Sequence, residues 1–341
     1  MVTIPSAAAA DAAAAAPTPP STDLILRSMS AGGEVAVLAI DGTALVADAV
    51  ARHGTAPTAS AALGRALIGA LLLSCFKGEG EATQVTFNGT GPLGSLQAIA
   101  TADGRVKGRC DNPAADPPLR ADGKLDVGAA VGRGVLAVVR SRAVPPPADG
   151  SPPPPSTPPY TGLTQIVSGE VAADLAHYLA TSEQTNCALA LGVSLDRAGA
   201  VAAAGGFLVQ VLPFCPDAAL EALEANIAAL PPITELMASG DGSPAALTSR
   251  LLAGLGVAPG AFSLAPAYGP CEKADLRARM VRAVALLGAD EVRDIVATQG
   301  GLEVRCEFCR DVELFGEEEV LAAVEAARAA GVARLIGKGG E

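Results

Sequence analysis

The chain has 341 residues and a formal net charge of −12 at pH 7, and although 50% of its residues are hydrophobic, only 3% are aromatic and none is Trp. This length allows two domains with linkers, but much of the apolar content is Ala, whose small side chain buries little surface. An acidic chain repels nucleic acid and anionic membranes, so the composition argues against both as partners.

Residues 1–22 are rich in Ala, Pro, Ser and Thr and contain one acidic and no basic residue. Such a segment lacks the large apolar side chains that a packed core requires. It is either a disordered tail or the remnant of an organelle-targeting leader, although leaders are usually rich in Arg. The two interpretations leave the cytoplasm and an organellar stroma, such as that of a plastid, as alternative locations.

Strands are predicted where short apolar stretches are bounded by Gly, Pro and Asp. They lie at Val35–Ile40, Gln84–Phe87, Leu96–Thr101, Val135–Val139, Thr164–Val167, Ala188–Val193 and Phe207–Leu212. Asp41-Gly42 and Asp103-Gly104 are typical of hairpin turns. Residues 144–159 read VPPPADGSPPPPSTPP, and because Pro supplies no ladder N–H, an exposed loop is expected there. Together with helices, these strands predict an α+β core domain over residues 23–215.

Two helices are predicted inside this core domain. Residues 57–76 carry leucines at helical spacing, with Thr58 or Ser60 as the N-cap. Their longest apolar run, Ala66–Phe76, is about half of the ~20 residues that a membrane span needs, so a core helix is expected. A second helix should begin at Gly169-Glu170 and continue through Tyr178.

Gly89, Gly91 and Gly94 satisfy the pattern G-x-G-x-x-G after a predicted strand. A dinucleotide site needs a helix after this loop, so that the pyrophosphate meets the helix N-terminus. Here Ser95–Thr101 predicts a strand instead, and Pro92 lies inside the loop. The segment is therefore predicted to be a turn between strands.

The sequence offers no recognisable catalytic set. His53 and His177 are far apart and near no obvious nucleophile or metal cluster, and the apolar neighbours of His177 are typical of a core residue. The motifs G-x-S-x-G, H-E-x-x-H and the P-loop are absent. We therefore expect a protein that is not an enzyme.

Beyond Cys215 the apolar residues recur at helical spacing, stop at Pro231-Pro232 and then resume. These residues are Leu220, Leu223, Ile227, Leu230, Ile233, Leu236 and Met237. With a second helix over Pro244–Leu255, they predict a helical segment spanning residues 216–258. A contiguous apolar stripe of this kind is typical of an interaction surface, and an ordinary docked helix pair is the alternative.

The seven cysteines suggest two different uses. Four of them lie singly in apolar stretches and are expected to be buried thiols in a reducing compartment; they are Cys75, Cys110, Cys187 and Cys215. Cys306 and Cys309 form a C-x-x-C pair, which can bind one metal ion or close a local disulfide. Cys271 can supply a third ligand, and because no His follows, the fourth would be a carboxylate, water or another chain.

Several stretches, taken together and in order, resemble the 33 kDa redox-regulated heat-shock chaperonin family. They are NGTGPLG with IATADGRVKG, YTGLTQIVSGEVAADLAHYLATSEQ, AAGGFLVQVLP, LEALEANIAALPPI and EVRDIVATQGGLEVRCEFCRDVELFGEEEV. The resemblance runs from about Asp23 to Val320 and treats the Pro-rich loop as an insertion. Several matches in the same order are more specific than any single motif.

This resemblance implies a mixed sheet-and-helix core, the helical linker, a small zinc domain over residues 259–325, and a C-terminal helix and tail over 326–341. It also implies ATP-independent holding of unfolded clients under stress, as a homodimer when active, and activation when oxidation expels zinc. The helical segment 216–258 would then be the family's linker, and its apolar stripe is the candidate surface for binding clients. The family switch uses C-x-C followed by C-x-x-C. Only the second pair is intact here.

An ungapped alignment on Arg277 and Arg279 puts Lys273 and Asp275 at the two C-x-C positions, and a gap would put Cys271 at the second. Either way at least one thiolate is missing. The predicted zinc ligands are therefore Cys271, Cys306 and Cys309 with Asp275 or Glu272 as the fourth, and Cys306–Cys309 is the predicted redox disulfide. Such a site should bind zinc less tightly than four thiolates, which predicts weakened redox gating.

Two other interpretations of the C-x-x-C pair have less support in the sequence. A thiol–disulfide oxidoreductase would use Cys306 and Cys309, but enzymes of that class usually place the first Cys at a helix N-terminus. Here the pair falls between LEVR and VELF, two strand-like stretches, which suits zinc better. A zinc ribbon that binds nucleic acid is disfavoured by the negative charge.

Overall fold

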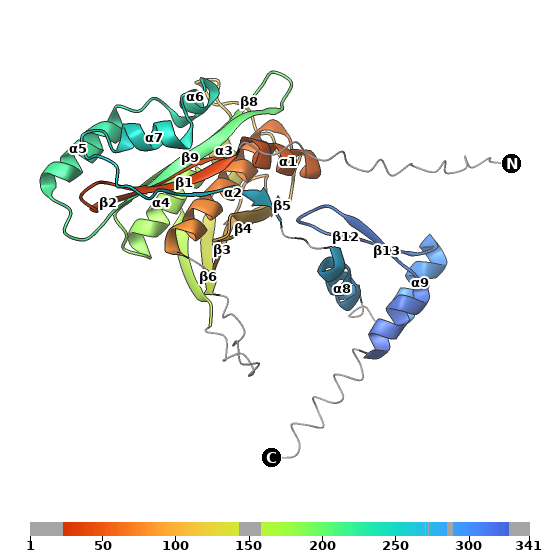
Figure 1. Cartoon of the computed structure of the whole chain (residues 1–341). Helices are drawn as coiled ribbons and strands as arrows, with labels where there is room; N and C mark the ends of the chain where they lie inside the picture. The colour runs from red at the N-terminus through yellow and green to blue at the C-terminus, as the bar shows by residue number, and fades with distance from the viewer. Residues whose placement is uncertain are drawn as a thin grey trace, which may run out of the picture.

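The structure is a computed structural model, and it describes residues 23–78, 80–142, 158–269, 271, 273–284 and 289–326. Three predictions therefore fall outside the described residues: the N-terminal segment 1–22, nearly all of the Pro-rich loop 144–159, and nearly all of the tail 326–341. Figure 1 shows a large body built on two sheets and a smaller C-terminal part beside it.

The first sheet has five strands in the order β10-β1-β2-β9-β8, all antiparallel within the described residues. The strands are β1 (Leu24–Met29), β2 (Val35–Asp41), β8 (Cys187–Leu195), β9 (Val201–Val211) and β10 (Phe262–Leu264). Strand β2 is buried from Val35 to Ile40, because both faces of the sheet are covered. Its uninterrupted apolar run is typical of a strand with no solvent face.

The second sheet has the order β11-β5-β4-β3-β6-β7, in which only the β11–β5 pair is parallel. Its strands are β3 (Glu81–Gly89), β4 (Ser95–Thr101), β5 (Arg105–Cys110), β6 (Gly134–Arg142), β7 (Tyr160–Ile166) and β11 (Ala267–Tyr268). The glycine-rich segment after β3 is a turn into β4, as predicted. Asp103-Gly104 joins β4 to β5 as the predicted hairpin.

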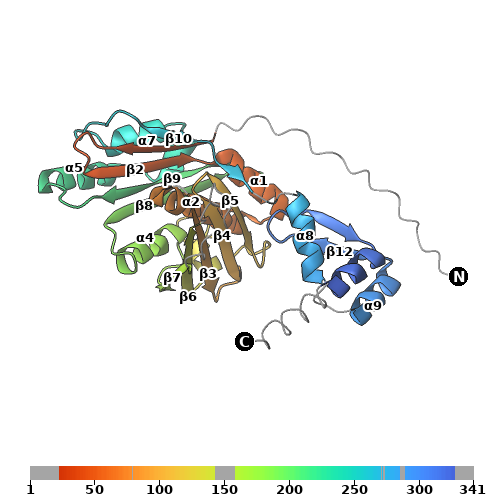
Figure 2. The same ribbon diagram turned by 60° about the horizontal axis from the view of Figure 1, so that its bottom comes forward.

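Helix α2 (Pro57–Lys77) lies between the two sheets, as Figure 2 shows, and contacts strands of both. Helices α1 (Thr43–His53), α3 (Val127–Val131) and α4 (Val171–Thr181) pack around it. Its leucines and alanines form the centre of the largest hydrophobic cluster. By length and composition residues 57–76 could cross a membrane, but 89% of that stretch is buried inside the protein, which identifies it as a core helix.

Helices α5 (Asp217–Ala228), α6 (Ile233–Ala238) and α7 (Pro244–Leu251) cover the other face of the five-stranded sheet (Figure 1). They form a second hydrophobic cluster with alternate residues of β2 and β9, such as Val37 and Phe207. Helix α7 ends at Leu251, earlier than the predicted Leu255, because Leu252 to Leu255 form a turn.

The C-terminal part has its own small hydrophobic cluster. It consists of α8 (Lys273–Val284), α9 (Ala289–Gln299), the hairpin β12 (Leu302–Arg305) and β13 (Val312–Phe315), and a helical stretch over 317–326 that begins at Glu317. The Arg277 guanidinium ties α8 to the hairpin, since it pairs with Glu313 at 2.5 Å and lies 4.5 Å from the centre of the Phe315 ring. It also pairs with Glu319, on the helical stretch that follows, at 2.7 Å.

Two local predictions were wrong. Asp41-Gly42 is not a hairpin turn, because the Asp41 carboxylate accepts hydrogen bonds from the N–H and the hydroxyl of Thr43 and so starts helix α1. Neither Thr58 nor Ser60 is the N-cap of α2, since Ala56 occupies that position.

Candidate metal and redox site

Three cysteines from two separate segments of the sequence meet at the junction of the C-terminal part and the large body. The Sγ atoms of Cys271, Cys306 and Cys309 all lie within 4.8 Å of one another. Cys309 is buried and the other two are half-buried. This is the only group of His, Cys, Asp and Glu side chains with metal-site spacing that the described residues contain.

Cys271 is positioned by the second sheet. Strand β11 pairs with β5 at its edge, and the backbone N–H groups of Ala267 and Gly269 donate to the carbonyl oxygens of Gly104 and Val106 at 3.0 and 2.8 Å. The chain therefore leaves this sheet two residues before Cys271 and then enters α8. One thiol of the cluster is thus fixed to the large body.

Cys306 and Cys309 are positioned by the hairpin turn between β12 and β13. The turn is closed by two backbone hydrogen bonds of 2.9 Å, from Cys306 N–H to the Asp311 carbonyl and from Arg310 N–H to the Cys306 carbonyl. Arg310 has a φ of +64°, a left-handed conformation that reverses the chain after the second cysteine. The C-x-x-C pair therefore lies on a turn, as the sequence predicted, and not at a helix N-terminus.

The surroundings of the three thiols shift their pKa values in different directions. Burial alone would raise the pKa of Cys306, but the backbone N–H groups of Cys309 and Phe308 and the thiols of Cys309 and Cys271 donate toward its sulphur, and together they lower its pKa. Burial and the neighbouring Cys306 raise the pKa of Cys271. Burial first, and then interaction with Cys306, raises the pKa of Cys309. The cluster therefore favours a single thiolate, on Cys306.

The cluster fits a zinc ion. In a tetrahedral zinc site with Zn–S bonds of about 2.3 Å, two sulphurs are about 3.8 Å apart. The three sulphurs found here lie within 4.8 Å of one another, so they can surround one ion. Binding would displace the protons of the two remaining thiols. The fourth position is untested, because the side chains of Glu272 and Asp275 lie outside the described residues.

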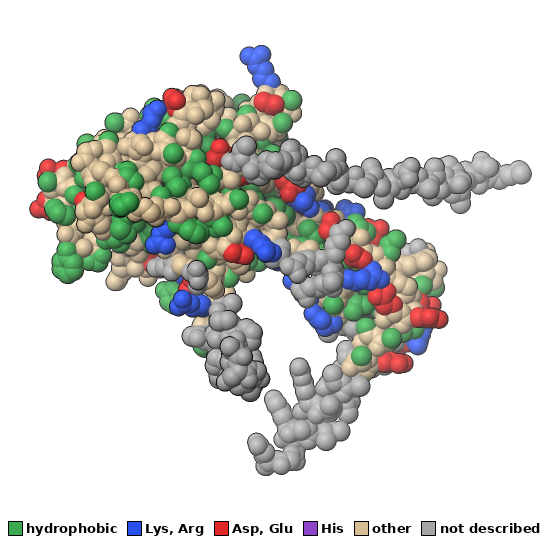
Figure 3. Space-filling model, in the orientation of Figure 1, with side chains coloured by type: hydrophobic (Ala, Val, Ile, Leu, Met, Phe, Trp, Pro, Cys, Tyr) green, Lys and Arg blue, Asp and Glu red, His purple; other side chains and the backbone are tan. Residues whose placement is uncertain are grey.

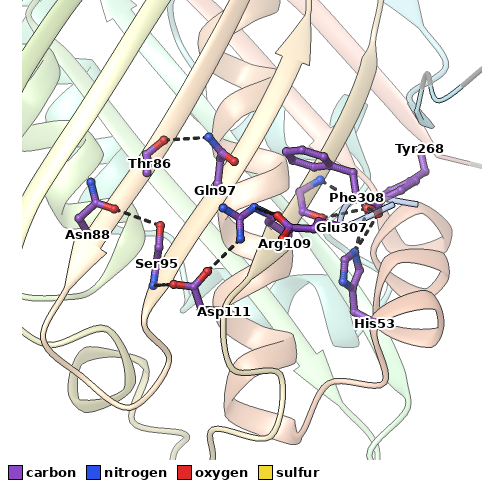
Figure 4. A network of polar contacts seen from close by, with 11 residues as sticks. His53, Thr86, Asn88, Ser95, Gln97, Arg109, Asp111, Tyr268, Glu307 and Phe308 are labelled. Carbon is purple, nitrogen blue, oxygen red and sulfur yellow. Dashed lines mark hydrogen bonds and ion pairs between the residues drawn. The ribbon is translucent and has the colours of Figure 1, made fainter. Parts of the chain in front are cut away.

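The two residues between the cysteines contact the large body (Figure 4). The carbonyl oxygen of Phe308 accepts hydrogen bonds from the Tyr268 hydroxyl at 2.5 Å and from His53 Nε2 at 3.0 Å. The carboxylate of Glu307 lies 3.2 Å from Arg109 Nε on β5. The turn is therefore bound to α1, β5 and β11 as well as to its own hairpin.

The structure corrects both histidine interpretations. His53, which is near no metal cluster in sequence, is buried and contacts the C-x-x-C turn. His177, predicted to be a core residue, is exposed on α4. Tyr268 also contacts this turn, and no motif in the sequence points to it. No sequence signal links these side chains, because His53 is separated from Phe308 by 255 positions.

The four isolated cysteines are not members of this cluster. Burial raises the pKa values of Cys75, Cys110 and Cys187 to about 11, so these thiols stay protonated at neutral pH. Cys110 is buried, while Cys75, Cys187 and Cys215 are half-buried.

The apolar stripe of the predicted linker lies on α5 and α6 and in the connection between them, facing the five-stranded sheet. Leu223, Leu236 and Met237 are buried. The remaining members of the stripe are half-buried; they are Leu220, Ile227, Leu230 and Ile233. A groove of about 360 Å³ lies between α5 and the edge of β8, and Leu220, Leu223 and Ile227 line it.

The family described as Hsp33 protein matches residues 23–315. The 33 kDa chaperonin of Thermus thermophilus is 42% identical over 313 residues, which cover 89% of this chain and 87% of that protein. The 33 kDa chaperonin of Geobacter sulfurreducens is 39% identical over 300 residues, which cover 88% of this chain and 94% of that protein.

A solved structure has the same fold. The crystal structure of the 33 kDa chaperonin, a heat shock protein 33 homologue, from Thermotoga maritima superposes with a TM-score of 0.79 at 29% sequence identity. The match covers 91% of this chain and all of that chain (100%). The predicted mixed sheet-and-helix fold is thereby confirmed.

Proposed function

Since this chain belongs to the Hsp33 protein family and is a chaperone of that type rather than an enzyme, we propose that a three-thiolate zinc site gates its holding activity. The observation that carries the proposal is the convergence of Cys271, Cys306 and Cys309 within 4.8 Å. When bound, zinc would crosslink the β12–β13 turn to the segment that leaves β11. The crosslink would favour the folded form of the C-terminal part.

We propose that oxidation opens this site. The thiols of Cys306 and Cys309 would form one S–S bond, giving two electrons and two protons to a peroxide, which is reduced to two molecules of water or to water and an alcohol. Cys271 would then be left without its partners. Because a cluster of three thiolates binds zinc less tightly than four, the reduced protein should retain part of its activity.

We infer that the released linker binds the client. The stripe from Leu220 to Met237 packs on the five-stranded sheet and would present a contiguous apolar surface once α5 and α6 leave it. The division proposed is a core over 23–215, a linker over 216–258 and a switch domain over 259–325. The third hydrophobic cluster, which contains the cysteines, supports a separate switch unit from α8 onward. Strands β10 and β11, at 262–268, pair with β1 and β5, so the first residues of the proposed switch domain belong to the sheets of the large body.

The partners of the protein are unfolded client proteins, as its chaperonin relatives imply. We propose that neither nucleic acid nor membrane is a partner and that the active form is a homodimer. The relatives named above are bacterial, and they give no support to a plastid location, so we propose the cytoplasm. The oxidoreductase alternative has less support, because the C-x-x-C pair lies on a hairpin turn.

Zinc content measured before and after peroxide, together with holding activity, tests the proposal. We expect about one zinc per reduced chain, loss of zinc on oxidation, and stronger suppression of citrate synthase aggregation afterwards. Cys306→Ser should lose zinc and hold clients without peroxide, whereas Cys187→Ser, on β8 and outside the cluster, should behave as the parent protein.

Two results would count against it. If the reduced protein contained no zinc and had the same holding activity as the oxidised protein, zinc would not gate that activity. Catalysis of insulin reduction that depends on Cys306 would favour the oxidoreductase.

A further inference from the structure

We propose that the core holds the C-x-x-C turn through the Phe308 carbonyl, and that this contact, in addition to the thiols, keeps the switch closed. We call it the Phe308 contact, formed by His53, Tyr268 and the Phe308 carbonyl. It rests on the proposed function, because it concerns the regulation of the same site. According to this proposal, residues outside the cysteine cluster also help to keep the C-terminal part in its resting position.

The carbonyl oxygen of Phe308 has two donors, and both are anchored in the large body. Tyr268 Oη lies 2.5 Å from it and also 3.0 Å from the carbonyl oxygen of Gly108 on β5. His53 Nε2 lies 3.0 Å from it and 3.1 Å from Tyr268 Oη. Since a carbonyl only accepts, His53 must carry its proton on Nε2 to make this bond.

The two side chains that donate to the Phe308 carbonyl are held in place by their own surroundings in the large body. His53 is only 8% exposed although it closes the last turn of α1, and the Arg52 guanidinium lies 5.2 Å from the centre of the Tyr268 ring. Two buried or half-buried side chains from different elements therefore converge on one backbone oxygen. If that oxygen left, the buried His53 N–H would lose a hydrogen-bond acceptor, which is unfavourable.

The side chains on either side of this carbonyl reinforce it, as Figure 4 shows for Glu307 and Arg109. The ammonium group of Lys107 lies 5.3 Å from the centre of the Phe308 ring. Arg109 is oriented by Asp111 at 2.9 Å and reaches Glu307 at 3.2 Å. The Glu307 carboxylate is mostly exposed, so this pair serves orientation more than stability.

The position of Tyr268 explains why the contact matters to the switch. Tyr268 belongs to β11, which is paired with β5, and it precedes Cys271 by only three positions. The hydrogen bond to Phe308 therefore joins the same two segments that the thiols join, the end of β11 and the β12–β13 turn. In a cluster with three thiolates, this bond supplies a connection that does not depend on metal or on redox state.

Hydrogen–deuterium exchange of the full reduced, zinc-loaded chain tests the proposal. Tyr268→Phe removes the hydroxyl and keeps the ring, so exchange of residues 302–315 should rise about fivefold, as expected for the loss of one hydrogen bond. His53→Leu should act in the same direction, and His53→Gln, whose amide can donate in place of Nε2, should restore protection. Zinc content should stay at the parent level.

The chain offers matched controls. Tyr160→Phe on β7 and His177→Leu on α4 make the same chemical changes at exposed positions, and neither should alter exchange of the hairpin. Unchanged protection of α2 would show that each variant is folded. The reduced Tyr268→Phe protein should also suppress client aggregation better than the parent.

Each outcome has a separate meaning. Hairpin exchange in Tyr268→Phe equal to that of the parent would overturn the proposal, and so would zinc loss in proportion to the rise in exchange, because the tyrosine would then act through the metal site. If exchange rises at constant zinc but no form of the protein holds a client, the Phe308 contact stands and the proposed gating function fails.

Discussion

Each cysteine in this chain has a local environment that sets its chemistry. Cys75, Cys110 and Cys187 are surrounded by apolar side chains, and burial keeps them as thiols. Cys306 is also partly buried, yet two backbone N–H groups of its own turn and two neighbouring thiols donate toward its sulphur. Burial alone therefore does not decide which cysteine is reactive. The decisive difference is the set of donors that a C-x-x-C turn directs at its first sulphur.

His53 gives the Phe308 contact a pH dependence. Burial, followed by the charges of Arg310 and Arg52, lowers the pKa of His53, although its hydrogen bonds to backbone carbonyls act the other way. The docked form thus prefers neutral His53, whereas a released His53 would titrate near its ordinary value of about 6.5. Stability from docking is therefore fully present above about pH 6.5 and is lost as the pH falls through the lower, docked pKa.

We therefore predict that exchange of residues 302–315, corrected for the intrinsic effect of pH, rises between pH 7.5 and pH 5.5. Because zinc ligands also take up protons in this range, the comparison must be made with His53→Gln, which has no titrating ring. The variant should show a smaller rise than the parent. An equal rise in both proteins would assign the pH dependence to the thiolates.

At the level of single residues, the cysteine cluster could be predicted and its docking could not. Cys306 and Cys309 are close in sequence, and with Cys271 they form a recognisable metal-ligand pattern. His53 and Tyr268 have no such pattern, because 215 positions separate them and only the packing of α1 beside β5 and β11 brings them together. Side chains that act on a backbone carbonyl leave no motif in the sequence.

The contact of α6 with strand β8 depends on a glycine. A Cβ atom built on Gly192 would lie 2.6 Å from Ile233 Cγ2 and 3.0 Å from the backbone nitrogen of Thr234. These distances are shorter than a carbon tolerates, so the first turn of α6 approaches β8 closely only because the position has no side chain. Ile233 belongs to the proposed client-binding stripe, and the glycine is therefore a support for its resting position.

We predict that Gly192→Ala lifts α6 and weakens its docking by about 1–3 kcal/mol, the usual effect of overpacking. The reduced protein should then suppress client aggregation more strongly than the parent, without loss of zinc. Gly42→Ala is the matched control, since its Cβ would meet Ile40 and Ile68 at an ordinary 3.7 Å. Parent-level activity in Gly192→Ala, with α6 shown by hydrogen exchange to be loosened, would argue against the stripe as the client surface.

Elements with a strong apolar period were predictable, and those started by a distant side chain were not. The buried strands and α2 carry their own pattern, so their existence was evident. Helix α1 was not predicted: Asp41 accepts the N–H of Thr43, but the next two N–H groups, on Ala44 and Leu45, donate to the distant carboxylate of Asp23, at 3.0 and 2.7 Å. Likewise Asp116, 58 positions away, accepts the Thr58 N–H at the start of α2. Local capping rules cannot detect such partners.

On the scale of the whole molecule, the distribution of polar and apolar surface differs between the two parts. On the face shown in Figure 3, charged side chains are sparse over the sheets and linker helices and dense over the C-terminal part. The net charge of −12 would oppose association of client-loaded molecules. A chaperone that exposes apolar helices needs such a charge to stay in solution.

The sizes of the hydrophobic clusters predict which part of the molecule unfolds first. The cluster around α2 is extensive, whereas that of the C-terminal part is small and includes Cys309 among its buried residues. Cores this small are rarely stable without a metal, a disulfide or a partner surface. The C-terminal part should therefore depend on zinc and on the Phe308 contact, while the large body depends on neither.

We predict that chelation of zinc from the reduced protein abolishes the exchange protection of residues 273–326 and leaves that of α2 and both sheets unchanged. Thermal unfolding should accordingly show two transitions, of which only the lower moves with free zinc, because metal that binds only the folded form stabilises only the unit that holds it. A single transition that shifts as a whole would mean that the two parts unfold together. In that case a metal-gated release of the C-terminal part could not occur while the core stays folded, and the linker helices could be released only by unfolding the sheet on which they pack.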